Sequence, residues 1–187
     1  MTEAGAINDF WLDEVGEAGW YNPPEGLDER IRDSYAQLWE TARTGGLDHW
    51  ARKREGALAL LILTDQFPRN MFRGSAEAFA TDARALALAA VSIAQGYDIA
   101  TEGPARQFFY LPFMHSEVLG DQERAVRLFL LRMPGGNVVH ARAHREVIRR
   151  FGRFPYRNEA LGRRTTAREA AFLEAGGYAE AVRVVSS

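Results

Sequence analysis

The chain has 187 residues, of which 47% are hydrophobic and 26% are charged, so it is long enough to bury a sizeable core. Its formal net charge of -2 and its pI near 6.1 argue against a nucleic-acid-binding protein, because such domains are usually basic. The absence of cysteine excludes disulfides, thiolate metal sites and cysteine nucleophiles.

The N-terminal stretch MTEAGAINDFW has neither the basic segment nor the apolar segment that is typical of a secretory signal. The longest apolar run, ALALLIL at residues 57–63, is too short to cross a bilayer. We therefore expect a cytoplasmic protein with no membrane partner and no nucleic-acid partner.

Helical periodicity dominates the first part of the chain. After Pro23 and Pro24, apolar residues recur at the spacing of one helix face, at Leu27, Ile31, Tyr35, Leu38 and Ala42. Residues 58–63 are apolar on every side, which predicts a helix in the middle of the structure. Pro68 disfavours helical geometry at Phe67, so this helix is predicted to end near Gln66.

The second part continues in the same way, with helix starts and stops at short intervals. Ser75 and Thr81 are candidate helix caps, and Gly152 is a candidate stop for a helix over residues 138–151. Residues 121–132 form an amphipathic pattern, and Thr166 with Glu169 forms a capping box for a last helix. We predict one all-α domain over residues 1–187, with seven to nine helices and short connections.

One short pattern occurs twice, as DQFPRN at residues 65–70 and as GRFPYRN at residues 152–158. In each corner a phenylalanine can fill the core, a proline can stop the preceding helix, and an asparagine, Asn70 or Asn158, can cap the next turn. This structural interpretation explains each corner taken alone.

Two features exceed what a helix stop requires. Asp65 is predicted to lie at the C-terminal end of its helix, where the dipole disfavours a carboxylate, so it needs a cation nearby. The corners also carry several arginines, which could converge with Asp65 into one pocket. The candidate ligand-binding residues, for a small anionic ligand, are Asp65, Arg69, Asn70, Arg73, Arg153, Arg157 and Asn158.

The stretch LPFMHSE places His115 and Glu117 just after Pro112. They form a candidate catalytic acid/base pair if the turn is irregular, because residues two apart do not share a helix face. The alternative is a hydrogen-bonded core histidine, which is the commoner use of a histidine among apolar residues. Ser116 lacks the glycines of a nucleophile elbow, so a serine hydrolase is not indicated.

His140 and His144 have the spacing of two zinc ligands on one helix face. The glutamate of the zincin pattern is missing, and a third ligand would have to come from His115 or Glu117. We therefore predict no metal site and no cofactor.

Three long stretches, LTDQFPRNMFRG, YLPFMHSE and RFGRFPYRNEALGRRTT, resemble a mostly bacterial family catalogued as domain of unknown function 924. The resemblance extends to FW at residues 10–11, LDHWA at 47–51 and AFATDARALALA at 78–89, and covers about residues 7–173. It implies an all-helical fold similar to that of tetratricopeptide-repeat proteins, although no 34-residue sequence period is present. It implies no activity. Tyr156 departs from the family pattern, which favours histidine there.

Three functions follow as hypotheses. The favoured one is binding of a small anionic ligand in a pocket of arginine, histidine and carboxylate side chains. The second is an enzyme that uses His115 and Glu117 as acid and base beside an arginine-lined anion site. The third is a purely structural polar network or a peptide-binding scaffold. An open cavity would favour the first two, and buried, fully paired side chains would favour the third. Oligomeric state and pathway are not predicted.

Overall fold

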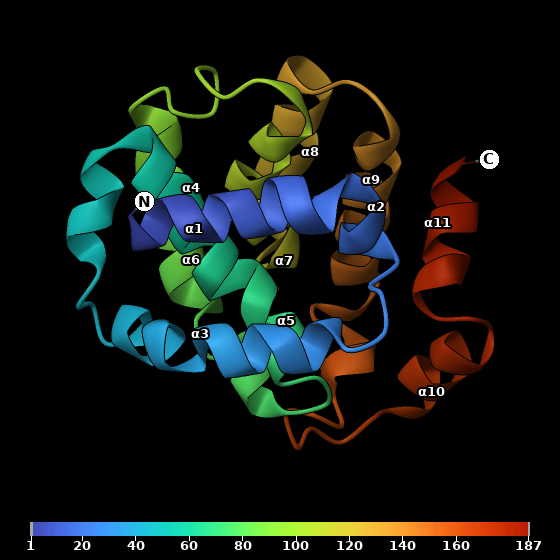
Figure 1. Ribbon diagram of the computed structural model, residues 1–187. Coiled ribbons are helices and arrows are strands. Elements are labelled where there is room, and N and C mark those ends of the chain that lie inside the picture. The colour runs from blue at the N-terminus through green and yellow to red at the C-terminus, as the bar shows by residue number, and fades with distance from the viewer. Residues whose placement is uncertain (1, 187) are drawn as a thin grey trace. The chain divides into compact units, whose positions relative to one another are not determined.

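The computed structural model describes residues 2–186, and the chain forms two compact units, unit 1 over residues 1–112 and unit 2 over residues 113–187. Within the described residues every regular element is a helix, which confirms the predicted all-α class (Figure 1). A single domain over the whole chain stays a prediction.

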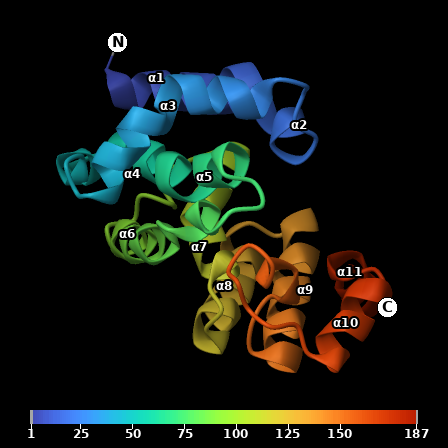
Figure 2. The same ribbon diagram turned by 90° about the horizontal axis from the view of Figure 1, so that it is seen from below.

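Unit 1 is built in layers (Figure 2). Helix α4 packs against α1 on one side and α6 on the other, and α3 packs against α5. The elements are α1 (Glu3–Asn8), η1 (Asp9–Val15), α2 (Gly16–Tyr21), α3 (Leu27–Arg43), η2 (Asp48–Arg52), α4 (Arg54–Leu61), η3 (Ile62–Gln66), α5 (Phe67–Met71), η4 (Ala76–Phe79), α6 (Asp82–Ala94) and η5 (Gly103–Phe109). Helix α7 (Leu111–His115) crosses the boundary at residue 112.

Helix α4 is the centre of unit 1, as its apolar run predicts. Every residue from Gly56 to Leu63 is buried, and the side chains of Leu61, Ile62 and Leu63 have no exposed surface. A helix that is apolar on all sides stabilises the fold most when other helices cover it completely, because all of its apolar surface is then removed from water. Unit 1 is therefore organised around the segment that leads directly into the first Phe-Pro corner.

The predicted helix end near Gln66 is wrong. The chain stays helical through η3, a π-helix, into α5, and Phe67 keeps helical dihedral angles of φ -56° and ψ -39°. Pro68 then falls in the first turn of α5, where its missing N–H is not needed. The wider π turn between the two α-helices thus accommodates a proline that would disrupt a continuous α-helix.

Several α-helices follow one another without a break. Elements α1 and η1 form one continuous run, which ends at Gly16 with φ 65° and ψ 175°, and α4, η3 and α5 form another. Counted as continuous runs, the α-helices of residues 2–186 number about ten, slightly more than the predicted seven to nine. The π-helical segment η3 explains why α4 and α5 are separate short α-helices.

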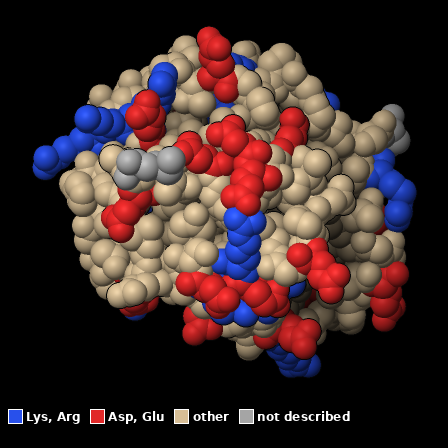
Figure 3. Space-filling model, viewed as in Figure 1, with Lys and Arg blue, Asp and Glu red and all other residues tan. Residues whose placement is uncertain are grey.

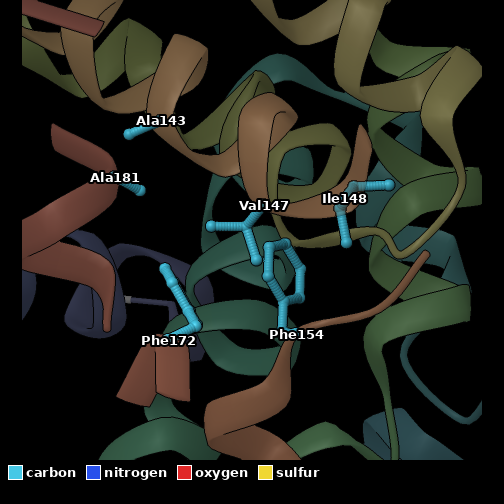
Figure 4. Close-up of a cluster of buried hydrophobic side chains, with 6 residues drawn as sticks. All are labelled: Ala143, Val147, Ile148, Phe154, Phe172 and Ala181. Carbon is cyan, nitrogen blue, oxygen red and sulfur yellow. The ribbon is translucent and has the colours of Figure 1, made fainter. Parts of the chain in front are cut away.

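Unit 2 contains α8 (Leu119–Arg132), α9 (Gly136–Phe151), η6 (Pro155–Arg157), α10 (Ala167–Glu174) and α11 (Tyr178–Ser186). Helix α9 lies between α8 and α11 and contacts both (Figures 1 and 2). Its core, shown in Figure 4, consists of Ala143, Val147, Ile148, Phe154, Phe172 and Ala181. Phe154 of the second corner points at Val147 and has no exposed surface, so it fills the core as predicted.

The sequence signals for helix ends have mixed outcomes. Thr166 and Glu169 form the predicted capping box, and Gly152 ends α9 in the left-handed conformation with φ 69°. Ser75 caps η4 by accepting a hydrogen bond from the Glu77 N–H. Thr81 does not cap α6 with its side chain, because its hydroxyl instead donates to the carbonyl oxygen of Thr64 at 2.6 Å.

Within residues 2–186, none of the helices is both long enough and apolar enough to span a bilayer.

Candidate functional site

In the first corner, Asp65 is 1% exposed and lies beside Arg69. Nη2 of Arg69 is 3.3 Å from Oδ1 of Asp65 and 2.8 Å from Oδ1 of Asp82. The predicted ion pair between Asp65 and a corner arginine is therefore present. Burial alone would lower the pKa of Arg69, but the two carboxylates together raise it above its ordinary value.

The other polar residues of this corner converge on Asp28 of α3. Arg73 donates from Nε and Nη2 to the two oxygens of Asp28, at 2.9 and 3.1 Å, and Asn70 donates to Oδ1 at 2.8 Å. Burial acts to raise the pKa of Asp28, but the bonds from Arg73 and Asn70 lower it below its ordinary value. The corner thus joins α5 to α3 through satisfied pairs, and Asn70 does not serve as a cap.

In the second corner, Arg153 holds the capping box of α10. Its Nε and Nη2 atoms donate to Oε1 and Oε2 of Glu169 at 2.6 and 2.8 Å. Glu169 also accepts from the backbone N–H and the hydroxyl of Thr166. The bond from Arg153 is the largest cause that holds the pKa of Glu169 well below its ordinary value. This arginine therefore has a structural partner in unit 2.

Asn158 is buried, and it organises the loop that follows η6. Its Oδ1 accepts from Nε of Arg163 at 3.1 Å, and its Nδ2 donates to the Thr165 hydroxyl at 3.3 Å. The predicted capping role is thus replaced by contacts that hold residues 158–165 together.

Both carboxylate oxygens of Glu117 are occupied. Arg163 donates to Oε2 at 2.7 Å and to Oε1 at 3.0 Å, and the Phe154 N–H donates to Oε1 at 2.7 Å. Burial acts to raise the pKa of Glu117, but these bonds lower it below its ordinary value. Glu117 therefore holds the second corner in place, and this arrangement favours a structural role over that of a proton acceptor.

Arg163 is the residue that sequence reasoning missed. It lies in the motif RFGRFPYRNEALGRRTT, but nothing local separates it from Arg164 beside it. Its partner, Glu117, is 46 residues away in the chain, so only folding brings the two together.

A group of rings lies along α9. The ring centroid of His144 is 6.4 Å from that of His115, 5.5 Å from Phe154 and 4.8 Å from Tyr178. The Tyr178 hydroxyl is 2.7 Å from Nδ1 of His140. The predicted acid/base candidate His115 thus lies next to a histidine rather than in a pair with Glu117. In residues 2–186, no three or more histidine, aspartate or glutamate side chains are grouped to hold a metal.

The protonation of His144 follows from its geometry. Its Nδ1 atom is 2.9 Å from the carbonyl oxygen of His140, which can only accept, so Nδ1 carries the hydrogen and Nε2 has a lone pair. Burial lowers the pKa of His144 to about 3, and the positive charges of His115, Arg157 and His140 act in the same direction. His144 is therefore neutral at pH 7.

Arg157 differs from the other predicted arginines in its setting. Its side chain is buried, at 7% exposed, and its Cζ atom lies 4.4 Å from the centroid of the Phe154 ring. Tyr156 stacks on the same ring at 5.3 Å between centroids. The guanidinium carbon thus lies over the Phe154 ring, close enough to His144 for its charge to lower the pKa of that histidine.

Residues 7–177 match the sequence profile of a family described as bacterial protein of unknown function, domain of unknown function 924. The chain belongs to this family. It is also similar to a solved structure of a protein of unknown function from Agrobacterium tumefaciens, with 41% sequence identity and a TM-score of 0.86. The match covers 91% of this chain and 96% of the other chain. No curated protein matches the chain.

All residues of the two corners, together with His115 and Glu117, lie within the part that matches the domain of unknown function 924 family. Tyr178 lies one residue beyond the matched range. Membership of this family assigns no ligand. The tetratricopeptide-like arrangement and the convergence of the two corners on one site stay predictions.

Proposed function

We propose that the chain binds a small anionic ligand in unit 2, at the group formed by His115, His144, Arg157 and Tyr178, called here the His-Arg cluster. The observation that carries the proposal is that buried Arg157 and His144 both lie against the Phe154 ring, and that His115 lies beside His144. The side chains whose charges act on His144 are His115, Arg157 and His140, all of them cationic when protonated.

Arg157 is cationic at pH 7, so a small anion that reached this group would be attracted to it. The guanidinium group of Arg157 is planar, which suits a carboxylate or a phosphate, and its Cζ atom lies over the Phe154 ring. The Nε2 lone pair of His144 would accept a hydrogen bond from a hydroxyl or amide group of the ligand. These features support a small carboxylate or phosphate that also carries a donor.

The contacts of the other candidates favour binding at this cluster over the alternatives. Arg69, Arg73 and Arg153 each have a carboxylate partner in their own unit, which supports a structural role for them. Glu117 is held by Arg163 and by the Phe154 N–H, which weakens the proposal of an enzyme that uses Glu117 as a base. A cytoplasmic location and the absence of a nucleic-acid partner remain proposals drawn from composition and charge.

The experiment compares thermal shifts with inorganic phosphate and with citrate, each against sodium chloride at equal ionic strength. A ligand that prefers the folded state raises the apparent stability. We expect a rise in Tm for the unmodified protein and loss of that rise in Arg157→Met. Arg149→Met is the matched control, because Arg149 lies in the same unit and makes an exposed pair with Glu146.

If Arg157→Met does not fold, His115→Gln takes its place, with the same expected loss. No rise in Tm with either anion would overturn the proposal. An equal rise in the unmodified protein and in a folded Arg157→Met or His115→Gln variant would also overturn it.

A further inference from the structure

Unit 1 contains a cavity of about 740 Å³ that the His-Arg cluster does not use. Its walls are α1 and the first residue of η1 on one side, and η2 with the start of α4 on the other. A cavity of this size is in the range that holds a small molecule.

The wall formed by η2 is held tightly against α4 at Gly56. A Cβ atom at this position would collide with the carbonyl oxygen of Trp50 and lie 2.9 Å from its carbonyl carbon. Only glycine permits this approach, and it fixes the backbone of Trp50 in the cavity wall. Trp50, Ala4 and Gly5 contribute an apolar lining.

Asn8 of α1 offers a buried acceptor at this cavity. Its Nδ2 donates to the carbonyl oxygen of Glu55 at 3.0 Å, and this contact fixes the orientation of the amide because a carbonyl can only accept. Oδ1 of Asn8 is buried and has no hydrogen-bond partner among the described residues. A buried acceptor without a donor is unfavourable, so a ligand N–H would improve this position.

The two walls differ in charge. Glu3 and Asp9 line the α1 side, whereas the other side carries Arg52 and Lys53 together with Glu55, whose carboxylate is 3.9 Å from Arg54. Within residues 2–186, the side chains of Glu3, Asp9, Arg52 and Lys53 make no ion pair and no side-chain hydrogen bond. Figure 3 shows acidic side chains gathered over the surface of α1 and η1, and basic side chains that project at the edge near the N-terminal end of α1.

We propose that this cavity binds a small zwitterionic molecule with an apolar body. Its ammonium group would lie toward Asn8 and Asp9, and its acidic group would lie toward Arg52 and Lys53. The apolar body would contact Trp50. The proposal is independent of the anion site in unit 2, because the cavity is lined by residues 2–56 alone.

The test uses three probes with one common body and different charges: L-phenylalanine, 3-phenylpropanoate without the amine, and 2-phenylethylamine without the carboxylate. Isothermal titration calorimetry measures each affinity. We expect L-phenylalanine to bind about tenfold more tightly than either other probe, which corresponds to one good charge-assisted hydrogen bond.

Variants of the charged lining residues test whether the probes bind in this cavity. Asp9→Asn should reduce the affinity for L-phenylalanine to that for 3-phenylpropanoate, and the double variant Arg52→Met, Lys53→Met should reduce it to that for 2-phenylethylamine. Asp33→Asn and Arg142→Met are matched controls, because both residues are exposed and lie outside the cavity lining.

Three results would overturn the proposal: no saturable binding of any probe at millimolar concentration, equal affinity for all three, or binding that the cavity variants leave unchanged. Circular dichroism shows whether each variant is folded before its affinity is interpreted.

Discussion

Glu117 and Arg163 form a two-bonded ion pair in unit 2, and the Phe154 N–H donates to the same carboxylate. The side chains are 28% and 23% exposed, so water screens this pair only partly. The pair ties the start of the second corner to the loop that follows it. This role leads to the first prediction.

Replacement of Glu117 by glutamine should lower the free energy of unfolding by about 1–3 kcal/mol, because an amide cannot accept at both positions and leaves Arg163 facing an NH₂ group. Urea denaturation measures the loss. Glu123→Gln is the control, since Glu123 and Arg145 pair in a more exposed setting, and its loss should stay below about 0.5 kcal/mol. Equal losses in the two variants would show that the Glu117 pair does not hold the corner.

In unit 1, Asp65→Asn should lower the free energy of unfolding by about 2–4 kcal/mol. Asp65 is buried, and its loss of charge weakens the compensation of Arg69. Glu40→Gln is the control because its pair with Arg43 is on the surface, and we expect no measurable change there. Urea denaturation of the two variants in parallel decides the matter, and a neutral Asp65→Asn would contradict the role assigned to the ion pair.

The third prediction concerns pH. The pKa of His144 is lowered from its ordinary value of 6.5 to about 3 in the folded state, so the unfolded chain binds a proton first as pH falls. The contribution of neutral His144 to the free energy of unfolding is fully present above pH 6.5 and is lost progressively as the pH falls below that value. Between pH 6.5 and pH 5 the free energy of unfolding should fall by at most about 2 kcal/mol from this group.

In the variant His144→Gln, the free energy of unfolding should depend much less on pH between pH 6.5 and pH 5. The groups that face His144 are His115, His140, Arg157 and Tyr178, and they are retained in the variant. Carboxylates with lowered pKa values, such as Glu117, lose their contribution mainly below this window. Chemical denaturation at several pH values measures the slope, and an unchanged slope in His144→Gln would rule out His144 as its source.

Gly56→Ala should destabilise the protein by about 2–4 kcal/mol, because the new methyl group collides with the backbone of Trp50 rather than with a flexible side chain. Gly120→Ala is the matched control, since a Cβ atom at Gly120 has open space around it in the first turn of α8. That variant should be neutral or slightly stabilised. Thermal unfolding compares them, and a neutral Gly56→Ala would show that η2 can move away from α4.

The prediction of a single domain can be tested with the four tryptophans, all of which lie in residues 11–50 of unit 1. Their fluorescence reports on unit 1, whereas far-UV circular dichroism reports on the helices of both units. We expect coincident urea transitions by the two probes, as for one cooperative unit. Two separated transitions would show that the units unfold as independent domains.

The same sequence pattern at the two Phe-Pro corners has different local outcomes. At Phe154 the backbone is extended and α9 has already ended at Gly152, as predicted. At Phe67 the helix continues, because the π turn of η3 shifts Pro68 to a position where it costs no hydrogen bond. Sequence rules locate the proline but do not show how the preceding turn adapts to it.

The sequence by itself determined the helical class, the family, the buried run at residues 58–63, the capping box at Thr166 and the stop at Gly152. These features depend on contacts within a few residues, where periodicity and capping rules apply. Only the tertiary structure decided which carboxylate meets each arginine. Asp28 lies 45 residues from Arg73, and Glu117 lies 46 residues from Arg163. An arginine can pair with any carboxylate that packing brings within reach, and that choice depends on long-range contacts that no local pattern specifies.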